Sequence, residues 1–173
     1  KFQSGEKPSA KAVLCLASYK PLHIYEWSGA IEIDELVRTV VTRQITEPKQ
    51  EETLKSKIPS FGKLKDLVSV KVAEQYEQYP YPRWVNTGIP LNAMTVSMFI
   101  KSSQLKLADN KIINVLAPDI LVAGCGTGQQ AIGTASKFKN SKVLSIDLSR
   151  SSLAYAKRKT SEYGFKNVEY IHG

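Results

Sequence analysis

Apolar residues recur at helical spacing in the first part of the chain, residues 1–65, and prolines separate the stretches. One apolar stripe runs over Lys11–Tyr19 and a longer one over Ile33–Thr46, and a stripe with this spacing is typical of the buried face of a helix. Because the residue before a proline is disfavoured in helical geometry, we expect these helices to end before Pro21 and Pro48. The pattern predicts short helices with breaks between them.

Two further helices are predicted in residues 66–110, after a polar helix at 50–57 and a linker at 59–62. The first covers Asp66–Tyr79 with Asp66 as its cap, and the second covers Asn92–Lys106 with Asn92 as its cap. The spacing in the second helix predicts four buried side chains: Met94, Met98, Phe99 and Leu105.

The pattern changes at Asp119, where short unbroken apolar runs begin to alternate with helical stretches. Strands are predicted at Ile120–Val122, Val143–Ile146 and Asn167–Ile171, and helices at Gln129–Phe138 and Ser149–Tyr163. Ser149 would cap the second helix and Gly164 would close it. Strands alternating with helices at short spacing indicate parallel strands joined by right-handed crossovers. The predicted fold class is therefore α/β: an N-terminal helical region followed by the first half of a doubly wound parallel sheet, divided into residues 1–65, 66–110 and 111–173.

A glycine-rich turn, Gly124–Gly128, follows the first predicted strand and precedes a helix. Glycine permits positive φ in a tight turn, and the missing Cβ lets a ligand touch the backbone. The first N–H groups of the following helix are free to face an anionic or hydrogen-bonding group. Open α/β sheets bind ligands at this position.

Asp147 ends the second predicted strand, and its distance from the turn can be estimated. The helix after the turn runs back roughly 15 Å, and a strand of about five residues returns a similar distance. Asp147 should therefore lie beside Gly124, where its carboxylate can accept two hydrogen bonds from a ribose diol, with Leu148 against a flat base. The pattern favours a nucleoside-containing cofactor; the alternative is a tight turn with Asp147 capping the helix at Ser149.

Two cofactor classes fit this half-fold. The dinucleotide pattern G-x-G-x-x-G fails from Gly124 because Gln129 occupies the last position, whereas the frame from Gly126 gives G-x-G-x-x-A through Ala131. That later frame keeps an NAD(P)-dependent oxidoreductase as one alternative. The contiguous G-x-G-x-G pattern instead resembles motif I of the class I S-adenosylmethionine-dependent methyltransferases, and residues 143–149 resemble their acidic second motif.

The resemblance extends over residues 120–130 and 147–157. Residues 76–84, Tyr-Glu-Gln-Tyr-Pro-Tyr-Pro-Arg-Trp, are similar to a segment just upstream of the domain in bacterial methyltransferases that often carry N-terminal tetratricopeptide repeats. The resemblance implies a Rossmann-like fold, S-adenosyl-L-methionine as cofactor, and methyl transfer to a protein, an RNA or a small molecule.

The same resemblance implies which residues hold the cofactor. Glycines and neighbouring backbone of the turn would contact the methionine and ribose parts, Asp147 the ribose hydroxyls and Leu148 the adenine. The implied set is Ala123, Gly124, Cys125, Gly126, Gly128, Asp147 and Leu148. Ala123 stands where many members have an acidic residue, and the acid that meets adenine would follow Gly173. No catalytic residue is predicted, because the family's substrate-side residues follow the fourth strand.

Aromatic residues and prolines alternate in residues 79–84, which indicates a stiff, extended segment. Tyr81, Arg83 and Trp84 are candidates for a lid over the cofactor pocket, and the alternative is that the segment packs the helices against the sheet. His23 and His172 have no partners at metal-ligand spacing, so no metal site is predicted.

The charge of the chain changes this picture little. The net charge is +8, spread as +1, +3 and +4 over residues 1–60, 61–118 and 119–173, so nucleic-acid binding has weak support. The apolar runs are far shorter than the roughly 18 residues of a membrane helix. The first residues do not show the pattern of a signal peptide, so we do not expect secretion. With two cysteines far apart, a cytoplasmic location is expected and no membrane partner.

The length counted from the turn predicts a fragment. Only 50 residues run from Gly124 through Gly173, whereas a full sheet of this class needs on the order of a hundred or more. We therefore expect a chain cut at both ends, inactive by itself, with an uncovered sheet edge that favours self-association. A non-catalytic interaction fragment, with the N-terminal helices as its docking surface, is the remaining alternative.

Overall fold

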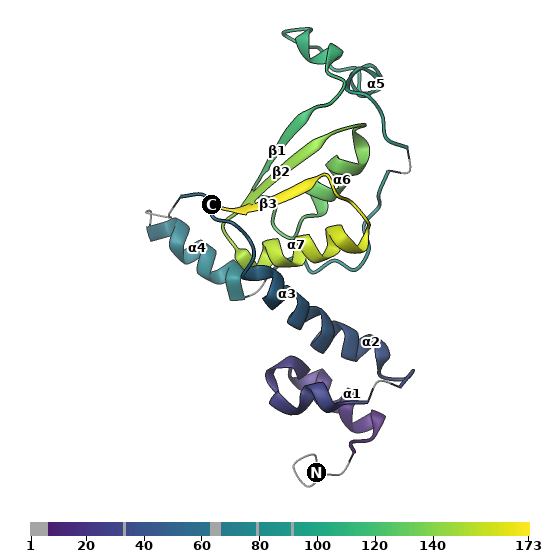
Figure 1. Cartoon of the computed structure of the whole chain (residues 1–173), viewed down its shortest axis with the longest axis vertical. Coiled ribbons are helices and arrows are strands. Elements are labelled where there is room, and N and C mark those ends of the chain that lie inside the picture. The colour runs from purple at the N-terminus through teal and green to yellow at the C-terminus, as the bar shows by residue number, and fades with distance from the viewer. Residues whose placement is uncertain (1–6, 33, 63–66, 79, 91) are drawn as a thin grey trace. The chain divides into compact units, whose positions relative to one another are not determined.

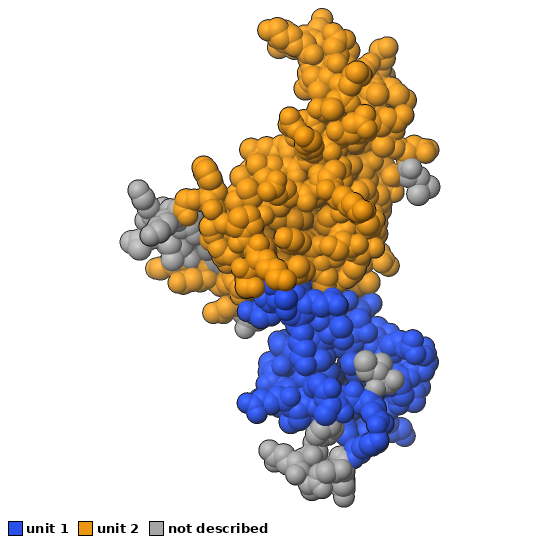
Figure 2. Space-filling model, in the orientation of Figure 1, with its two compact units in different colours: residues 1–53 blue, residues 54–173 orange. Residues whose placement is uncertain are grey.

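A computed structural model describes residues 7–32, 34–62, 67–78, 80–90 and 92–173 (Figure 1). The chain forms two compact units, residues 1–53 and 54–173 (Figure 2). The first holds α1 (Ala10–Tyr19), the 3₁₀ helices η2 (Leu22–Ile24) and η3 (Glu26–Ala30), α2 (Arg38–Val41) and the π-helical turn η4 (Thr42–Thr46). α3 (Glu47–Lys55) contains the boundary, and the second unit holds α4 (Leu67–Gln78), α5 (Val96–Ser102), η5 (Lys111–Asn114), β1 (Asp119–Ala123), α6 (Gln129–Lys137), β2 (Lys142–Asp147), α7 (Arg150–Glu162) and β3 (Val168–His172).

The first unit is a small helical cluster around an apolar core. The hydroxyl of Ser9 caps α1 by accepting the N–H of Ala12. The side chain of Gln44 donates to the carbonyl of Ala17 and accepts the N–H of Leu22, both at 3.1 Å, which joins η4 to the end of α1. The buried core residues are Val13, Leu22, Ile31, Val37, Val41 and Ile45.

The prediction that Pro48 ends a helix is wrong, because Pro48 is the second residue of α3. A proline lacks the backbone donor, and its ring crowds the carbonyl four residues earlier. Here the preceding turn is π-helical, with the N–H of Glu47 bonded to the carbonyl of Thr42, and this wider turn accommodates the proline. The predicted helix start at Ile33 lies outside the described residues.

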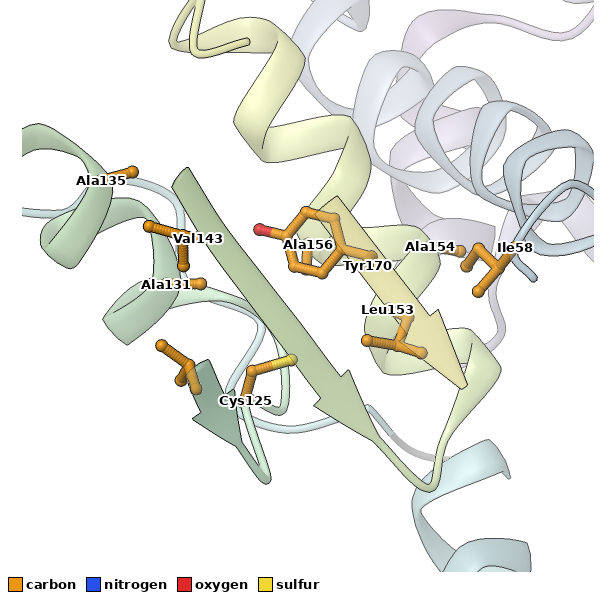
Figure 3. Close-up of a cluster of buried hydrophobic side chains, with 10 residues drawn as sticks. Ile58, Cys125, Ala131, Ala135, Val143, Leu153, Ala154, Ala156 and Tyr170 are labelled. Carbon is orange, nitrogen blue, oxygen red and sulfur yellow. The ribbon is translucent and has the colours of Figure 1, made fainter. Parts of the chain in front are cut away.

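The second unit is built on one three-stranded parallel sheet in the order β1-β2-β3. Asp119 pairs with Lys142, and Val143 pairs with Val168. The connection from β1 to β2 and that from β2 to β3 move across the sheet in the same direction. Because both connections have the same handedness, α6 and α7 lie on the same face of the sheet. Alternate strand residues, including Val122, Val143 and Tyr170, pack there against small side chains of the two helices (Figure 3). The predicted α/β class with parallel strands is confirmed.

The other face of the sheet is open to solvent. Leu121 is 61% exposed, and Leu144 and Ile146 are half-buried beside it. The predicted linker runs along the end of β3, where Phe61 donates to the carbonyl of His172 at 2.7 Å and the N–H of His172 donates to Pro59 at 2.9 Å. Residues 59–61 therefore cover one end of the outer sheet edge.

The helix predicted over residues 92–106 is shorter than expected. α5 begins at Val96 and is capped by Thr95, which accepts the N–H of Met98. The backbone of Met94 instead pairs with Lys137, the last residue of α6, and with Lys139, at 2.8 and 3.0 Å. Because Met94 is in this extended pairing, the helix cannot begin at Asn92. Met98 and Leu105 are more than half exposed, so the prediction that they are buried is wrong. α4 is present, whereas its predicted cap Asp66 and last residue Tyr79 lie outside the described residues.

Candidate functional site

The glycine turn begins where β1 ends and is bonded to the end of β2. The N–H groups of Gly124 and Cys125 donate to the carbonyl of Ile146 at 2.8 and 3.1 Å. Gly124 and Gly126 have φ of +67° and +52°, and a Cβ on either would meet nothing within 4 Å. The backbone at these two positions is therefore open to a ligand.

Gly128 has a different role in the turn. Its φ is +83°, and a Cβ there would lie 2.5 Å from the Cβ of Ala156 and 3.0 Å from the hydroxyl of Tyr170. The turn can pack against α7 only because residue 128 has no side chain. Gly128 therefore sets the approach of α7 to the turn.

Asp147 lies against the glycine turn, where its position was predicted. One carboxylate oxygen accepts the N–H of Gly126 at 2.7 Å, and the other accepts the N–H of Ser149 at 2.9 Å. The capping contact foreseen as the alternative is thus present together with the contact to the turn. Because each carboxylate oxygen can accept a second hydrogen bond, Asp147 still has capacity for a hydroxyl pair.

A cavity of about 710 Å³ lies over the turn, within the range of small-molecule sites. The predicted residues in its wall are Gly124, Cys125, Gly126, Asp147 and Tyr81. Ala123, Gly128, Leu148 and Arg83 are not in the wall. The guanidinium of Arg83 lies 4.7 Å from the centre of the Tyr155 ring, and the carbonyl of Leu148 accepts from His172 Nε2 at 3.1 Å.

Nine residues in the wall were not identified from the sequence: Tyr76, Pro82, Thr87, Gly88, Thr127, Gln129, Gln130, Gly133 and Ser152. Three of them, Thr127, Gln129 and Gln130, lie in or beside the glycine turn. Their closeness to the turn in the sequence is the feature from which their place in the wall could have been predicted. Tyr76 comes from α4, and nothing in its local pattern indicates that α4 ends beside the turn.

Residues 80–87 are tied to the turn and to α7. Trp84 is buried, and its indole N–H donates to the carbonyl of Thr127 at 3.1 Å. The hydroxyl of Thr127 donates to Pro82 at 2.7 Å, and Thr87 is bonded to Gln129 at 3.0 Å. Trp84 thus packs this segment against the domain, while Tyr81 is 75% exposed at the cavity. These contacts agree with the packing alternative for Trp84, and the lid role of Tyr81 and Arg83 stays a prediction.

The electrostatics of the wall disfavour a cysteine nucleophile. Burial, and secondarily the charge of Asp147, raise the pKa of Cys125 to about 12, so its thiol is protonated at neutral pH. Burial also raises the pKa of Tyr170, whose hydroxyl is 2.7 Å from that of Thr160.

In the described part of the chain, no three His, Cys, Asp or Glu side chains gather in a group that could hold a metal ion. None of the helices in that part is long and apolar enough to cross a membrane.

Comparisons with known proteins bear on the region that holds the site. Residues 120–173 match a sequence family described as a methyltransferase domain. No curated protein matches the chain.

Parts of the chain are also similar to solved structures, and three of these follow. PKMT2 from Rickettsia typhi is 29% identical over 32% of this chain and 11% of its own, with a TM-score of 0.31. Phosphoethanolamine N-methyltransferase 2 of Haemonchus contortus, in complex with S-adenosyl-L-methionine, is 19% identical over 58% of this chain and 24% of its own, with a TM-score of 0.38. Coclaurine N-methyltransferase, bound to N-methylheliamine and SAH, is 12% identical over 96% of this chain and 47% of its own, with a TM-score of 0.41.

This chain therefore spans less than half the length of each of these three proteins. The region that carries the glycine turn and Asp147 is similar to a methyltransferase domain.

Proposed function

We propose that the chain binds S-adenosyl-L-methionine over the glycine turn and serves methyl transfer to an acceptor. One observation carries the proposal: the Asp147 carboxylate is bonded to the N–H of Gly126 beneath open space at Gly124 and Gly126. The match of residues 120–173 to a methyltransferase domain supports it.

The residues present fit this cofactor. The open backbone at Gly124 and Gly126 can approach the methionine and ribose parts closely, because no Cβ intervenes. The remaining lone pairs of Asp147 suit the two ribose hydroxyls, and we assign Leu148 to the adenine side. When bound, the cofactor supplies an electrophilic methyl group, and the chain contributes binding, orientation and shelter from water.

We infer that the acceptor is a protein, an RNA or a small molecule in the cytoplasm. Cys125 is not proposed as its activating base, because a thiol with a pKa of about 12 is protonated at neutral pH and cannot accept a proton there. In this proposal the described cavity serves the cofactor, and no catalytic base is assigned.

Calorimetric titration with S-adenosylhomocysteine tests the cofactor assignment. We expect binding to the wild-type chain and at least about a tenfold loss for Asp147→Ala, because charged hydrogen bonds to the ribose disappear. Asp119→Ala is the matched control, since Asp119 is an exposed aspartate at the start of β1 and the glycine turn follows the other end of that strand. It should bind as the wild type does.

A parallel titration with NADH separates the two cofactor classes. NADH binding without S-adenosylhomocysteine binding would favour the oxidoreductase alternative. Undiminished S-adenosylhomocysteine binding by a folded Asp147→Ala variant would contradict the assignment of Asp147.

A further inference from the structure

A second polar cluster lies at the N-terminus of α7, outside the glycine turn. One carboxylate oxygen of Glu77, on α4, accepts the backbone N–H of Ser151 at 2.9 Å and lies 3.2 Å from the hydroxyl of Ser149. Ser149 is fully buried, and its hydroxyl also lies within donating distance, 3.0 Å, of the carbonyl of Tyr76. The last turns of α4 are thus bonded to the first turn of α7, and these helices are neighbours in Figure 1.

The carboxylate of Glu77 is held charged in this cluster. Its second oxygen pairs with the ammonium of Lys55 at 2.6 Å, and both side chains are about two-thirds buried. Burial would raise the pKa of Glu77, but the hydrogen bonds from Lys55 and Ser151 outweigh it and lower the pKa below 4.5. A negative charge at a helix N-terminus is favourable because the free N–H groups there carry partial positive charge.

Glu77 directly follows Tyr76, and Tyr76 lines the cavity together with Asp147 and Ser152. The position of Tyr76 in the wall therefore depends on how the end of α4 is attached to α7. Two of the attachments pass through Glu77, and the third is the bond from Ser149 to the carbonyl of Tyr76 itself.

We propose that Glu77 is a positioning residue for the cofactor site: by capping α7 from the neighbouring helix, it holds Tyr76 in the cavity wall beside Asp147. The inference rests on the proposed function and deepens it by adding α4 to the part of the site that faces the nucleoside. Without the carboxylate, the N–H of Ser151 and the charge of Lys55 lose their partner. The end of α4 can then shift and take Tyr76 with it.

Titration of S-adenosylhomocysteine into four variants tests this role. We expect Glu77→Ala to weaken binding about tenfold, since one or two hydrogen bonds that hold the wall are lost. Glu77→Gln keeps an acceptor for Ser151 and should recover most of the affinity, and Lys55→Gln should show a smaller loss. Glu74→Ala, an exposed position on the same helix, is the matched control and should stay within about twofold of the wild type.

A double-mutant cycle separates positioning from a general loss of stability. If Glu77 acts through Tyr76, Glu77→Ala should change the affinity by less than about twofold in a Tyr76→Ala background. Additive losses would overturn the proposal, as would wild-type affinity of a folded Glu77→Ala protein. If Glu77→Ala does not fold, the Tyr76→Ala variant tests the proposal. Unchanged binding by Tyr76→Ala would show that Tyr76 does not contribute to the cofactor site, and the proposal would be wrong.

Failure of the underlying function has a separate signature. If the wild-type chain binds no S-adenosylhomocysteine, the proposed function fails and this inference falls with it. If the wild type binds and the Glu77 variants bind equally well, the inference alone is wrong.

Discussion

Gly128 is the residue at which the site and the core constrain each other most closely. A Cβ at this position would lie 2.5 Å from a side-chain carbon of Ala156 and 3.1 Å from its Cα, and the φ of +83° is unfavourable for other residues. We expect Gly128→Ala to lower the free energy of unfolding by about 2 to 4 kcal/mol, from backbone strain and overpacking together. Urea unfolding measures this change.

Gly133→Ala is the control for that substitution. Gly133 lies inside α6, and a Cβ there meets nothing within 4 Å. Alanine is the better helix former, so this variant should be neutral or more stable by up to about 1 kcal/mol. Equal stability of the Gly128 variant and the wild type would contradict the close approach of α7.

Single residues also show how far sequence reasoning reaches into the site. The contact of Asp147 with the turn was predictable, because the lengths of one helix and one strand determine where that strand ends. Tyr76 and Glu77 were not predictable in this way, since their roles depend on how α4 packs against α7. The cofactor contacts of Ala123, Gly128, Leu148 and Arg83 stay predictions, although these residues lie outside the cavity wall.

At the scale of elements, the contact between α4 and α7 should contribute less to the free energy of unfolding at acid pH. The lowered pKa of Glu77 means that its stabilising contribution is fully present above the unfolded-state value near 4.5 and is lost as the pH falls through the folded-state value. The difference in unfolding free energy between wild type and Glu77→Gln should therefore be largest near about pH 7 and shrink below about pH 4.5. Urea unfolding at several pH values measures it, and a difference that grows toward acid would have the wrong sign.

Elements were predicted well where their determinants are local. The strands and both crossover helices of the sheet begin and end within one residue of the predicted bounds, and Ser149 and Gly164 terminate α7 as expected. The errors at Pro48 and Asn92 have non-local or unusual causes. A π-helical turn accommodates the proline, and pairing of Met94 with the end of α6 and the residues after it prevents the longer helix.

At the scale of the whole molecule, the open sheet face carries the prediction of self-association. Leu121 is 61% exposed on this face, and removing such a surface from water favours contact between copies. We expect the chain to form oligomers in sedimentation velocity runs at micromolar concentration, and Leu121→Glu to shift it toward monomer. Leu116→Glu is the control, because Leu116 is also exposed but precedes the sheet. Identical sedimentation of both variants and the wild type would contradict a role for this face.

The division into residues 1–65, 66–110 and 111–173 stays a prediction at this scale. The compact units divide at residues 53 and 54. Composition alone cannot locate that boundary, because it falls inside a continuous helix, α3.

The short strand-like pairing of residues 59–61 with His172 has a consequence for how copies can assemble. Of the two outer strands of the sheet, β3 is already bonded at its C-terminal end, so an incoming strand could pair with only the first part of it. The outer edge of β1 is the longer available template in the described chain. When two copies pair their β1 edges about a two-fold axis, both edges are occupied, and no β1 edge is left for a third copy. Pairing through the β1 edge therefore closes at two subunits, and a further copy would have to pair with the shortened free edge of β3.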